Sequence, residues 1–104
     1  MSPWAYLTAL AITLGCEAPI VWLGYRGRAR FGRLAGGFVA VNLFTHGLLW
    51  SLRPSTTGRV ALAELMIVLV ESALYARLFG GGARRALAVS LAANALSLAV
   101  GLAV

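Results

Sequence analysis

The chain has 104 residues, of which 61% are hydrophobic, and its mean hydropathy is +0.86. A soluble domain of this size could not bury so much apolar surface, so the composition excludes a soluble globular protein and indicates an integral membrane protein. The formal net charge is +6, but no basic helix and no interleaved aromatic platform is present, which argues against nucleic-acid binding.

Four apolar segments are long enough to cross about 30 Å of hydrocarbon, which takes about 20 helical residues each. They are expected at residues 4–24, 34–52, 60–79 and 86–104. Short links between consecutive helices make neighbouring helices antiparallel. The sequence therefore predicts an all-α fold, in which residues 1–104 form a single transmembrane domain and an up-down four-helix bundle.

The nine arginines are spread unevenly over the connections. Four lie at residues 26–33 and three at residues 77–85, whereas only Arg53 and Arg59 flank the second connection. Cytoplasmic loops are enriched in arginine, so this seven-to-two bias predicts that the first and third connections face the cytoplasm and that both termini lie outside. The expected location is the bacterial inner (plasma) membrane, which the chain would cross several times in contact with the lipid bilayer.

The first segment carries Thr13, Cys16 and Glu17 on one side, followed by Pro19. Proline in a helix frees the carbonyl four residues earlier, here that of Gly15, and a freed carbonyl beside a carboxylate can coordinate a cation in a membrane. A packing kink is the simpler interpretation of the proline. Cys16, the only cysteine, is more simply a small buried residue than a metal ligand.

The other three segments also have one polar face each. In the second, Asn42, Thr45 and His46 are spaced i, i+3, i+4. The third carries Glu64, Glu71 and Tyr75 at i, i+7, i+11. The fourth has a stripe of small polar residues, Ser90, Asn94, Ser97 and Gly101. Polar groups facing lipid would lose their hydrogen bonds, so all four faces are expected to turn inward.

The predicted topology sets the depth of these groups, at about 1.5 Å per residue. Three are expected about 6 to 10 Å below the outer surface: His46, Glu64 and Ser97. Asn42, Glu71 and Asn94 would lie near the midplane, with Glu17 at the midplane or somewhat inside it. The arrangement predicts a polar cavity that opens outward and ends blindly. Five aromatic residues near the segment ends are interpreted as an interfacial belt: Trp4, Tyr6, Tyr25, Trp50 and Tyr75.

All three acidic residues of the chain and its only histidine lie within the apolar segments. Carboxylates in hydrocarbon are costly, so they are expected to be protonated, paired with the histidine or bound to a cation. The sequence predicts a site that binds or relays a cation, formed by Glu17, His46, Glu64 and Glu71. The supporting residues would be Asn42, Thr45, Tyr75, Asn94 and Ser97.

The cation could be a proton or a divalent metal such as Zn, Mn or Fe, with the same glutamates and histidine as candidate ligands. No sequential metal motif is present. An accessory subunit of a larger membrane complex is the main alternative, since polar side chains also join helices in membranes. An intramembrane hydrolase using Ser97, His46 and a glutamate is less favoured, and no catalytic residue is assigned. A homodimer could form through Gly36, Gly37 and Ala40.

A set of short motifs runs through the chain in order: Glu-Ala-Pro at 17–19, Asn-Leu-Phe-Thr-His at 42–46, Glu64 and Glu71 seven residues apart, and Asn94 with Ser97. In these motifs the chain resembles a family of uncharacterised small four-helix bacterial integral membrane proteins. In similar sequences a proline often follows the Thr-His pair, whereas here Gly47 does. The resemblance implies a fold and a location but no activity.

The small multidrug resistance transporters share the four-helix length and a membrane-embedded glutamate in the first helix. The aromatic and glycine pattern expected in their later helices is missing here, and they do not place Glu and His in the second and third helices. The strong arginine bias also argues against the dual topology of those transporters. We therefore do not assign the chain to that family.

Overall fold

The computed structural model describes residues 3–52 and 55–103, and these residues form four α-helices. The helices are α1 (Pro3–Tyr25), α2 (Phe31–Leu52), α3 (Thr57–Phe79) and α4 (Ala83–Ala103). The fold is therefore all-α, as the composition predicts. Arg53, which the sequence analysis assigns to the second connection, and residue 104, the predicted end of the last segment, lie outside the described residues.

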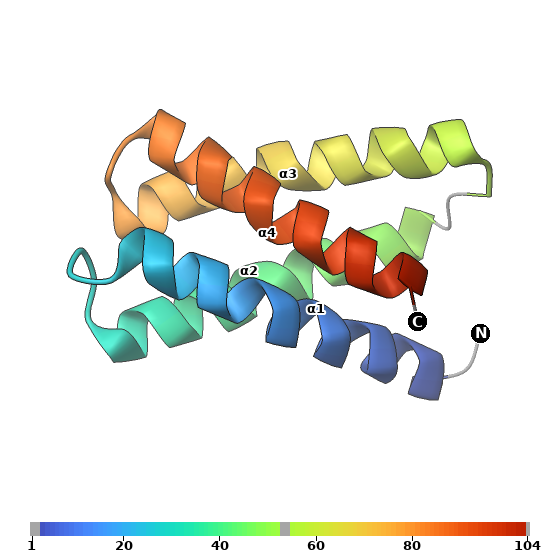
Figure 1. Cartoon of the computed structure of the whole chain (residues 1–104), viewed down its shortest axis with the longest axis horizontal. Helices are drawn as coiled ribbons and strands as arrows, with labels where there is room; N and C mark the ends of the chain where they lie inside the picture. Colours follow the sequence, from blue (N-terminus) through green and yellow to red (C-terminus); the bar gives the residue numbers. More distant parts are fainter. Residues whose placement is uncertain (1–2, 53–54, 104) are drawn as a thin grey trace.

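The helices lie side by side in a bundle whose extents are 38 × 25 × 23 Å (Figure 1). Helix α1 packs against α2 and α4, and α3 packs against the same two helices. The two ends of the chain lie at one end of the bundle in Figure 1, and the connections 26–30 and 80–82 lie at the other. We call these the terminal end and the arginine end.

Among the described residues, three helices are long and apolar enough to cross a membrane: α1, α2 and α4. Helix α3 has the same length as α1, but it carries Glu64 and Glu71 between Arg59 and Arg77. Its outward-facing leucines, Leu62, Leu65 and Leu69, are nevertheless exposed. The chain thus has the composition of a membrane protein, with one helix that combines an apolar outer face and a charged inner one.

A capping threonine and a glycine mark the start and the end of α3. The Thr56 side chain accepts a hydrogen bond from the backbone N–H of Arg59 at 3.2 Å and so caps α3. Gly80 ends that helix with a φ of +73°, a conformation that costs glycine little. Helix α2 begins at Phe31, whose ring packs edge-on against Trp22 at 6.0 Å. The first connection is therefore residues 26–30, and Arg33, predicted to lie within it, belongs to the first turn of α2.

The apolar core fills the arginine end of the bundle. It is built from the last turns of α1 and α3 and the first turns of α2 and α4, and includes Val21, Tyr25, Phe38, Tyr75 and Phe79. The ring of Tyr75 stacks on Phe79 with centroids 5.6 Å apart, and Tyr25 contacts Phe79 at 5.0 Å. The interpretation of Tyr25 and Tyr75 as interfacial residues is wrong, because both are 0% exposed.

Two glycines allow close helix contacts in this core. A Cβ at Gly24 of α1 would collide with the side chain of Val89 on α4, and a Cβ at Gly37 of α2 would lie 2.8 Å from the Phe79 ring on α3. Gly37, predicted to serve a homodimer, thus packs against its own chain. Gly36 and Ala40 stay exposed on the surface of the bundle.

A buried polar cavity as the candidate functional site

The polar residues gather in the half of the bundle that the apolar core leaves free. Glu17 is 0% exposed and Glu71 is 1% exposed, while Glu64 is half-buried. A small cavity of about 40 Å³ lies between the four helices. Its lining includes every predicted site residue except Tyr75: Glu17, Asn42, Thr45, His46, Glu64, Glu71, Asn94 and Ser97. The inward orientation of the four polar faces thus brings these side chains together.

Glu71 of α3 is held by side chains from two neighbouring helices. Thr45 Oγ1 of α2 lies 2.7 Å from Glu71 Oε2, and Asn94 Nδ2 of α4 donates to Glu71 Oε1 at 2.6 Å. The same Asn94 nitrogen donates to the carbonyl of Ser90 at 2.8 Å. Both carboxyl oxygens are therefore satisfied by neutral groups, which fix Glu71 at the centre of the bundle.

Glu17 of α1 is held on one side only. Ser97 Oγ of α4 lies 3.0 Å from Glu17 Oε2, whereas Glu17 Oε1 is buried without a hydrogen-bond partner. Glu17 thus lies in the same cavity as Glu71, but the side chains that hold Glu71 come from α2 and α4 and not from α1. An unpartnered carboxyl oxygen in a buried site is costly unless water or a cation satisfies it.

Tyr75 connects the polar cavity to the apolar core. Asn42 Nδ2 donates to the Tyr75 hydroxyl at 3.1 Å and to the carbonyl of Phe38 at 2.9 Å. The Tyr75 ring stacks on Phe79 in the core, and its hydroxyl reaches Asn42, which lines the cavity. Tyr75 therefore supports the site indirectly, through Asn42.

Three buried polar atoms without hydrogen-bond partners belong to side chains that line the small cavity: Glu17 Oε1, Asn42 Oδ1 and His46 Nε2. A buried water molecule usually makes two to four hydrogen bonds to such groups. A volume of about 40 Å³ accommodates about one or two water molecules. The cavity therefore has both the space and the polar partners for bound water.

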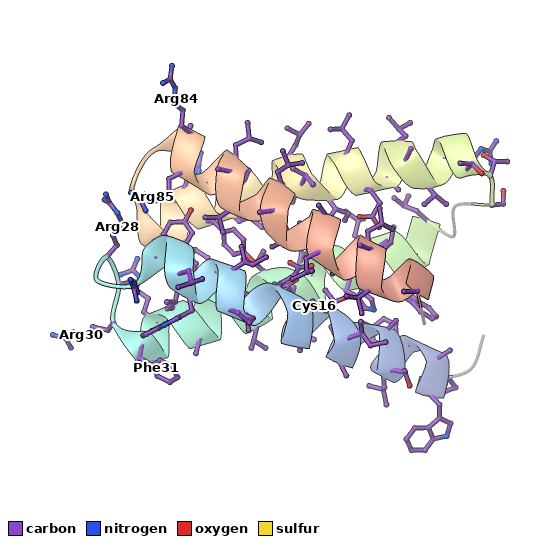
Figure 2. All side chains as sticks on the ribbon, in the orientation of Figure 1. Cys16, Arg28, Arg30, Phe31, Arg84 and Arg85 are labelled. Carbon is purple, nitrogen blue, oxygen red and sulfur yellow. The ribbon has the colours of Figure 1, made fainter. Side chains whose placement is uncertain are left out.

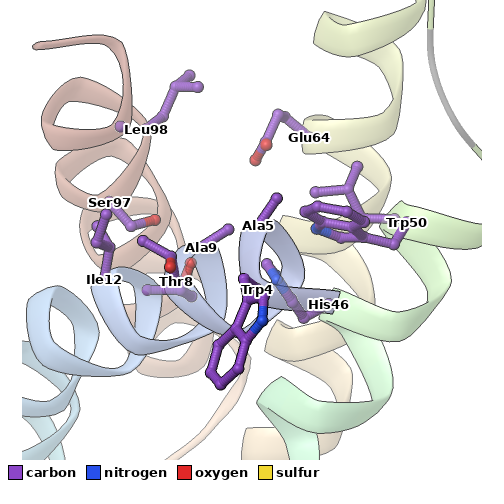
Figure 3. Close-up of a pocket in the computed structure, with 13 residues that line it drawn as sticks. Trp4, Ala5, Thr8, Ala9, Ile12, His46, Trp50, Glu64, Ser97 and Leu98 are labelled. Atoms are coloured by element: carbon purple, nitrogen blue, oxygen red, sulfur yellow. The ribbon is translucent and has the colours of Figure 1, made fainter. Parts of the chain in front are cut away.

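A wider cavity of about 570 Å³ lies at the terminal end and forms a vestibule to the small one (Figure 3). The two cavities share Thr13, His46, Leu49, Glu64 and Ser97 in their linings. Figure 3 shows Glu64, Ser97 and His46 around this space, each from a different helix. The polar residues therefore line a route from the terminal end of the bundle towards Glu71.

Aromatic side chains surround His46, although the sequence predicts only an interfacial belt for them. The ring centroids of Tyr6 and Trp50 lie 5.0 and 5.9 Å from that of the imidazole. The Tyr6 and Trp50 rings also contact each other, with centroids 5.1 Å apart. Trp50 follows His46 by four residues on α2, and this spacing was the signal that could have placed it beside the imidazole. Trp4 and Trp50 also line the vestibule.

The carboxyl groups of the site are not paired with arginine in the part of the chain that the structure describes. Within residues 3–52 and 55–103, no ion pair joins an arginine to any of the glutamates, and no group of three His, Cys, Asp or Glu side chains could hold a metal ion. Gly15 and Pro19 lie on the exposed side of α1, and neither they nor Cys16 line the cavity. The geometry therefore gives the divalent-metal alternative little support.

Ser97 and His46 do not form a nucleophile–base pair in this arrangement. Ser97 Oγ contacts Glu17 Oε2 and the carbonyl of Asn94, at 3.0 and 3.2 Å, and no hydrogen bond joins it to His46. A hydrolase triad requires that bond for activation of the serine.

No protein-family model, curated protein or solved structure matches the chain. The cavity is therefore the main basis for a proposal about its function.

Proposed function

We propose that the chain is a multi-pass protein of the bacterial inner membrane whose buried cavity takes up and relays protons from the outer side. The helices would cross the membrane in alternating directions, with both termini outside. The arginine bias supports this orientation, because seven of the nine arginines flank the connections at the arginine end. The vestibule at the opposite end would then face outward.

The exposed surface of α3 supports its crossing the membrane with the other three helices. Leu62, Leu65 and Leu69 form an exposed apolar row, while Glu71 is buried on the opposite side against α2 and α4. A soluble bundle would expose polar groups on such a face. In lipid, the leucines are solvated by hydrocarbon and the glutamates are sheltered inside.

The hydrogen bonds at Thr45 support a proton as the cation. Its hydroxyl carries one hydrogen but lies within 2.7 Å of Glu71 Oε2 and 3.1 Å of the Val41 carbonyl. When the hydroxyl donates to Glu71, the carboxylate is charged; when it donates to Val41, a protonated Glu71 donates to the hydroxyl. Both protonation states therefore keep the same heavy-atom contacts.

The observation that carries the proposal is the shared cavity of Glu17, Glu71 and His46 together with the vestibule that leads to it. Bound water in this cavity would join these side chains by hydrogen bonds. Glu64 lines both cavities and would exchange protons with the outside first. A metal is the weaker choice, because the cavity lacks the three clustered ligands described above.

Infrared spectroscopy of the protein in lipid vesicles tests this proposal. Stepping the pH should change a carboxyl stretching band, and Glu71→Gln should remove a component that exchanges slowly in deuterated water. Glu64→Gln is the matched comparison on the same helix: it should remove a component that exchanges quickly, because Glu64 faces the vestibule. Thermal melts of each variant establish that it is folded.

The proposal fails if the carboxyl bands of the wild-type protein do not respond to pH, or if the two variants remove the same rapidly exchanging component. Elemental analysis of the purified protein provides the complementary test. Stoichiometric Zn, Mn or Fe that is lost in His46→Ala would favour the metal over the proton.

A further inference from the structure

A further cavity of about 440 Å³ lies at the arginine end, separate from the polar cavity and its vestibule. Its basic lining comes from the first connection, the start of α2 and the end of α3: Arg28, Arg30, Arg33 and Arg77. Its remaining lining is Ala29, Leu78, Phe79 and Gly80. Four arginines line one pocket that also has apolar walls, and proton relay does not use this site.

No carboxylate is available to neutralise this pocket. All three acidic residues of the chain line the polar cavity in the other half of the bundle. Like charges that are brought together without a counter-ion repel one another. The arrangement therefore favours an anionic ligand that supplies the missing charge.

A contact with the backbone holds one of the lining arginines in place. Arg33 Nε donates to the carbonyl of Leu78 at 3.0 Å, which joins α2 to α3 and leaves its terminal nitrogens to bind an anion. Leu78 itself lines the pocket. The pocket thus combines the tethered Arg33 with the loop residues Arg28 and Arg30.

The first and third connections also meet at Gly81, which has a φ of +82°. A Cβ there would lie 2.8 Å from Arg85 Cδ and 3.3 Å from Arg28 Cδ. Arg28 of the first connection and Arg85 of the first turn of α4 therefore pack over one glycine. This contact adds a further positive charge close to the first connection.

We propose that this pocket binds the phosphate headgroup of an anionic phospholipid in the cytoplasmic leaflet. Guanidinium groups match phosphate oxygens in pairs, and basic pockets between membrane helices bind such headgroups. A lipid is favoured over a soluble phosphate because the pocket has apolar walls and lies where the exposed apolar helices end. The inference rests on the proposed membrane orientation, but not on proton relay.

Native mass spectrometry of the protein in neutral detergent, titrated with lipid, tests the site. The site variant is Arg28→Gln/Arg30→Gln, and the control with the same net charge is Arg59→Gln/Arg84→Gln. Arg59 lies at the terminal end, and Arg84 extends away from the bundle (Figure 2). Phosphatidylglycerol should bind the wild-type protein and the control equally, and the site variant about 30-fold more weakly.

Phosphatidylcholine and inorganic phosphate provide the other arms of the test. Phosphatidylcholine should bind all three proteins weakly and alike, because its headgroup is neutral overall. The proposal is overturned if the control loses as much affinity as the site variant, or if phosphatidylcholine equals phosphatidylglycerol. Binding of inorganic phosphate without phosphatidylglycerol would assign the pocket to a soluble anion instead. Arg30→Gln alone serves if the double variant does not fold, with an expected loss of about fivefold.

Discussion

Glu71 is the side chain on which the polar network depends most, because it receives contacts from both α2 and α4. In Glu71→Gln the amide can donate to Thr45 Oγ1 and its oxygen can accept from Asn94, as a protonated glutamate would. We expect the free energy of unfolding of this variant to lie within about 1 kcal/mol of that of the wild-type protein. Glu71→Leu leaves one of the two Asn94 amide N–H groups without its acceptor, while the other keeps the Ser90 carbonyl, and should lower the free energy of unfolding by about 1 to 3 kcal/mol.

Reversible unfolding in mixed detergent micelles measures both values. Gln and Leu at this position differ little in size, so the comparison isolates hydrogen bonding from packing. Equal stability of the two variants would mean that the contacts to Thr45 and Asn94 do not stabilise the bundle.

The two buried tyrosines of the core provide a second comparison between hydroxyl groups. The Tyr25 hydroxyl is buried without a hydrogen-bond partner, while the Tyr75 hydroxyl accepts from Asn42 at 3.1 Å. Tyr25→Phe should leave stability unchanged or raise it by up to about 1 kcal/mol, because it removes an unsatisfied group. Tyr75→Phe should lower stability by about 1 to 3 kcal/mol, because one of the two Asn42 amide N–H groups loses its acceptor while the other keeps the Phe38 carbonyl.

The melting temperatures of the two variants, measured in the same detergent, decide between these outcomes. The ring positions stay occupied in both, so aromatic packing against Phe79 serves as the internal control. A larger loss for Tyr25→Phe than for Tyr75→Phe would contradict the assignment of partners.

At the scale of the helices, the contact between α1 and α4 depends on Gly24. Gly24→Ala places a methyl group against Val89 and should destabilise the bundle by about 1 to 3 kcal/mol. Gly15→Ala is the matched control on the same helix, because nothing lies within 4 Å of its added Cβ. It should be neutral or stabilising by up to about 1 kcal/mol, since alanine favours helix.

Thermal unfolding of both variants tests the helix contact, and Val89→Ala should rescue Gly24→Ala in part by making room. If Gly24→Ala and Gly15→Ala behave alike, α1 and α4 do not approach as closely as described. A loss of stability in the Gly15→Ala variant alone would instead indicate that a partner contacts the exposed side of α1.

The number of helices and their inward faces follow from the sequence, because apolar length and 3.6-residue spacing are local properties. Which side chains meet across two helices does not follow from the sequence. Ser97 reaches Glu17 across 80 residues of sequence, and the contact depends on the rotation and axial offset of α1 and α4. Composition near a helix end likewise cannot separate an interfacial tyrosine from a core one, which is why Tyr25 and Tyr75 were misassigned.

In the molecule as a whole, polar and apolar groups occupy opposite halves of one short bundle. The aromatic core closes the arginine end, and the polar cavity opens through the vestibule at the terminal end. A proton entering the vestibule would therefore reach Glu71 and stop at the layer formed by Tyr25, Tyr75 and Phe79. Transfer across the whole membrane would require that layer to move, whereas sensing or binding of protons would not.

The end of the bundle that faces outward determines from which side protons reach the cavity. Because Cys16 is the only cysteine in the sequence, its replacement allows single cysteines to report the orientation. In a Cys16→Ser background, single cysteines at Ser55 and Ala83 place one thiol at each end of the bundle and leave every arginine in place; both positions are exposed. A membrane-impermeant maleimide applied to intact spheroplasts should label Ser55→Cys at once. It should label Ala83→Cys only after the membrane is permeabilised, if the seven-to-two arginine bias orients the chain as proposed. Labelling of both sites in intact spheroplasts would indicate mixed orientations. The reverse pattern would make the vestibule cytoplasmic, so that Glu71 would exchange protons with the cell interior.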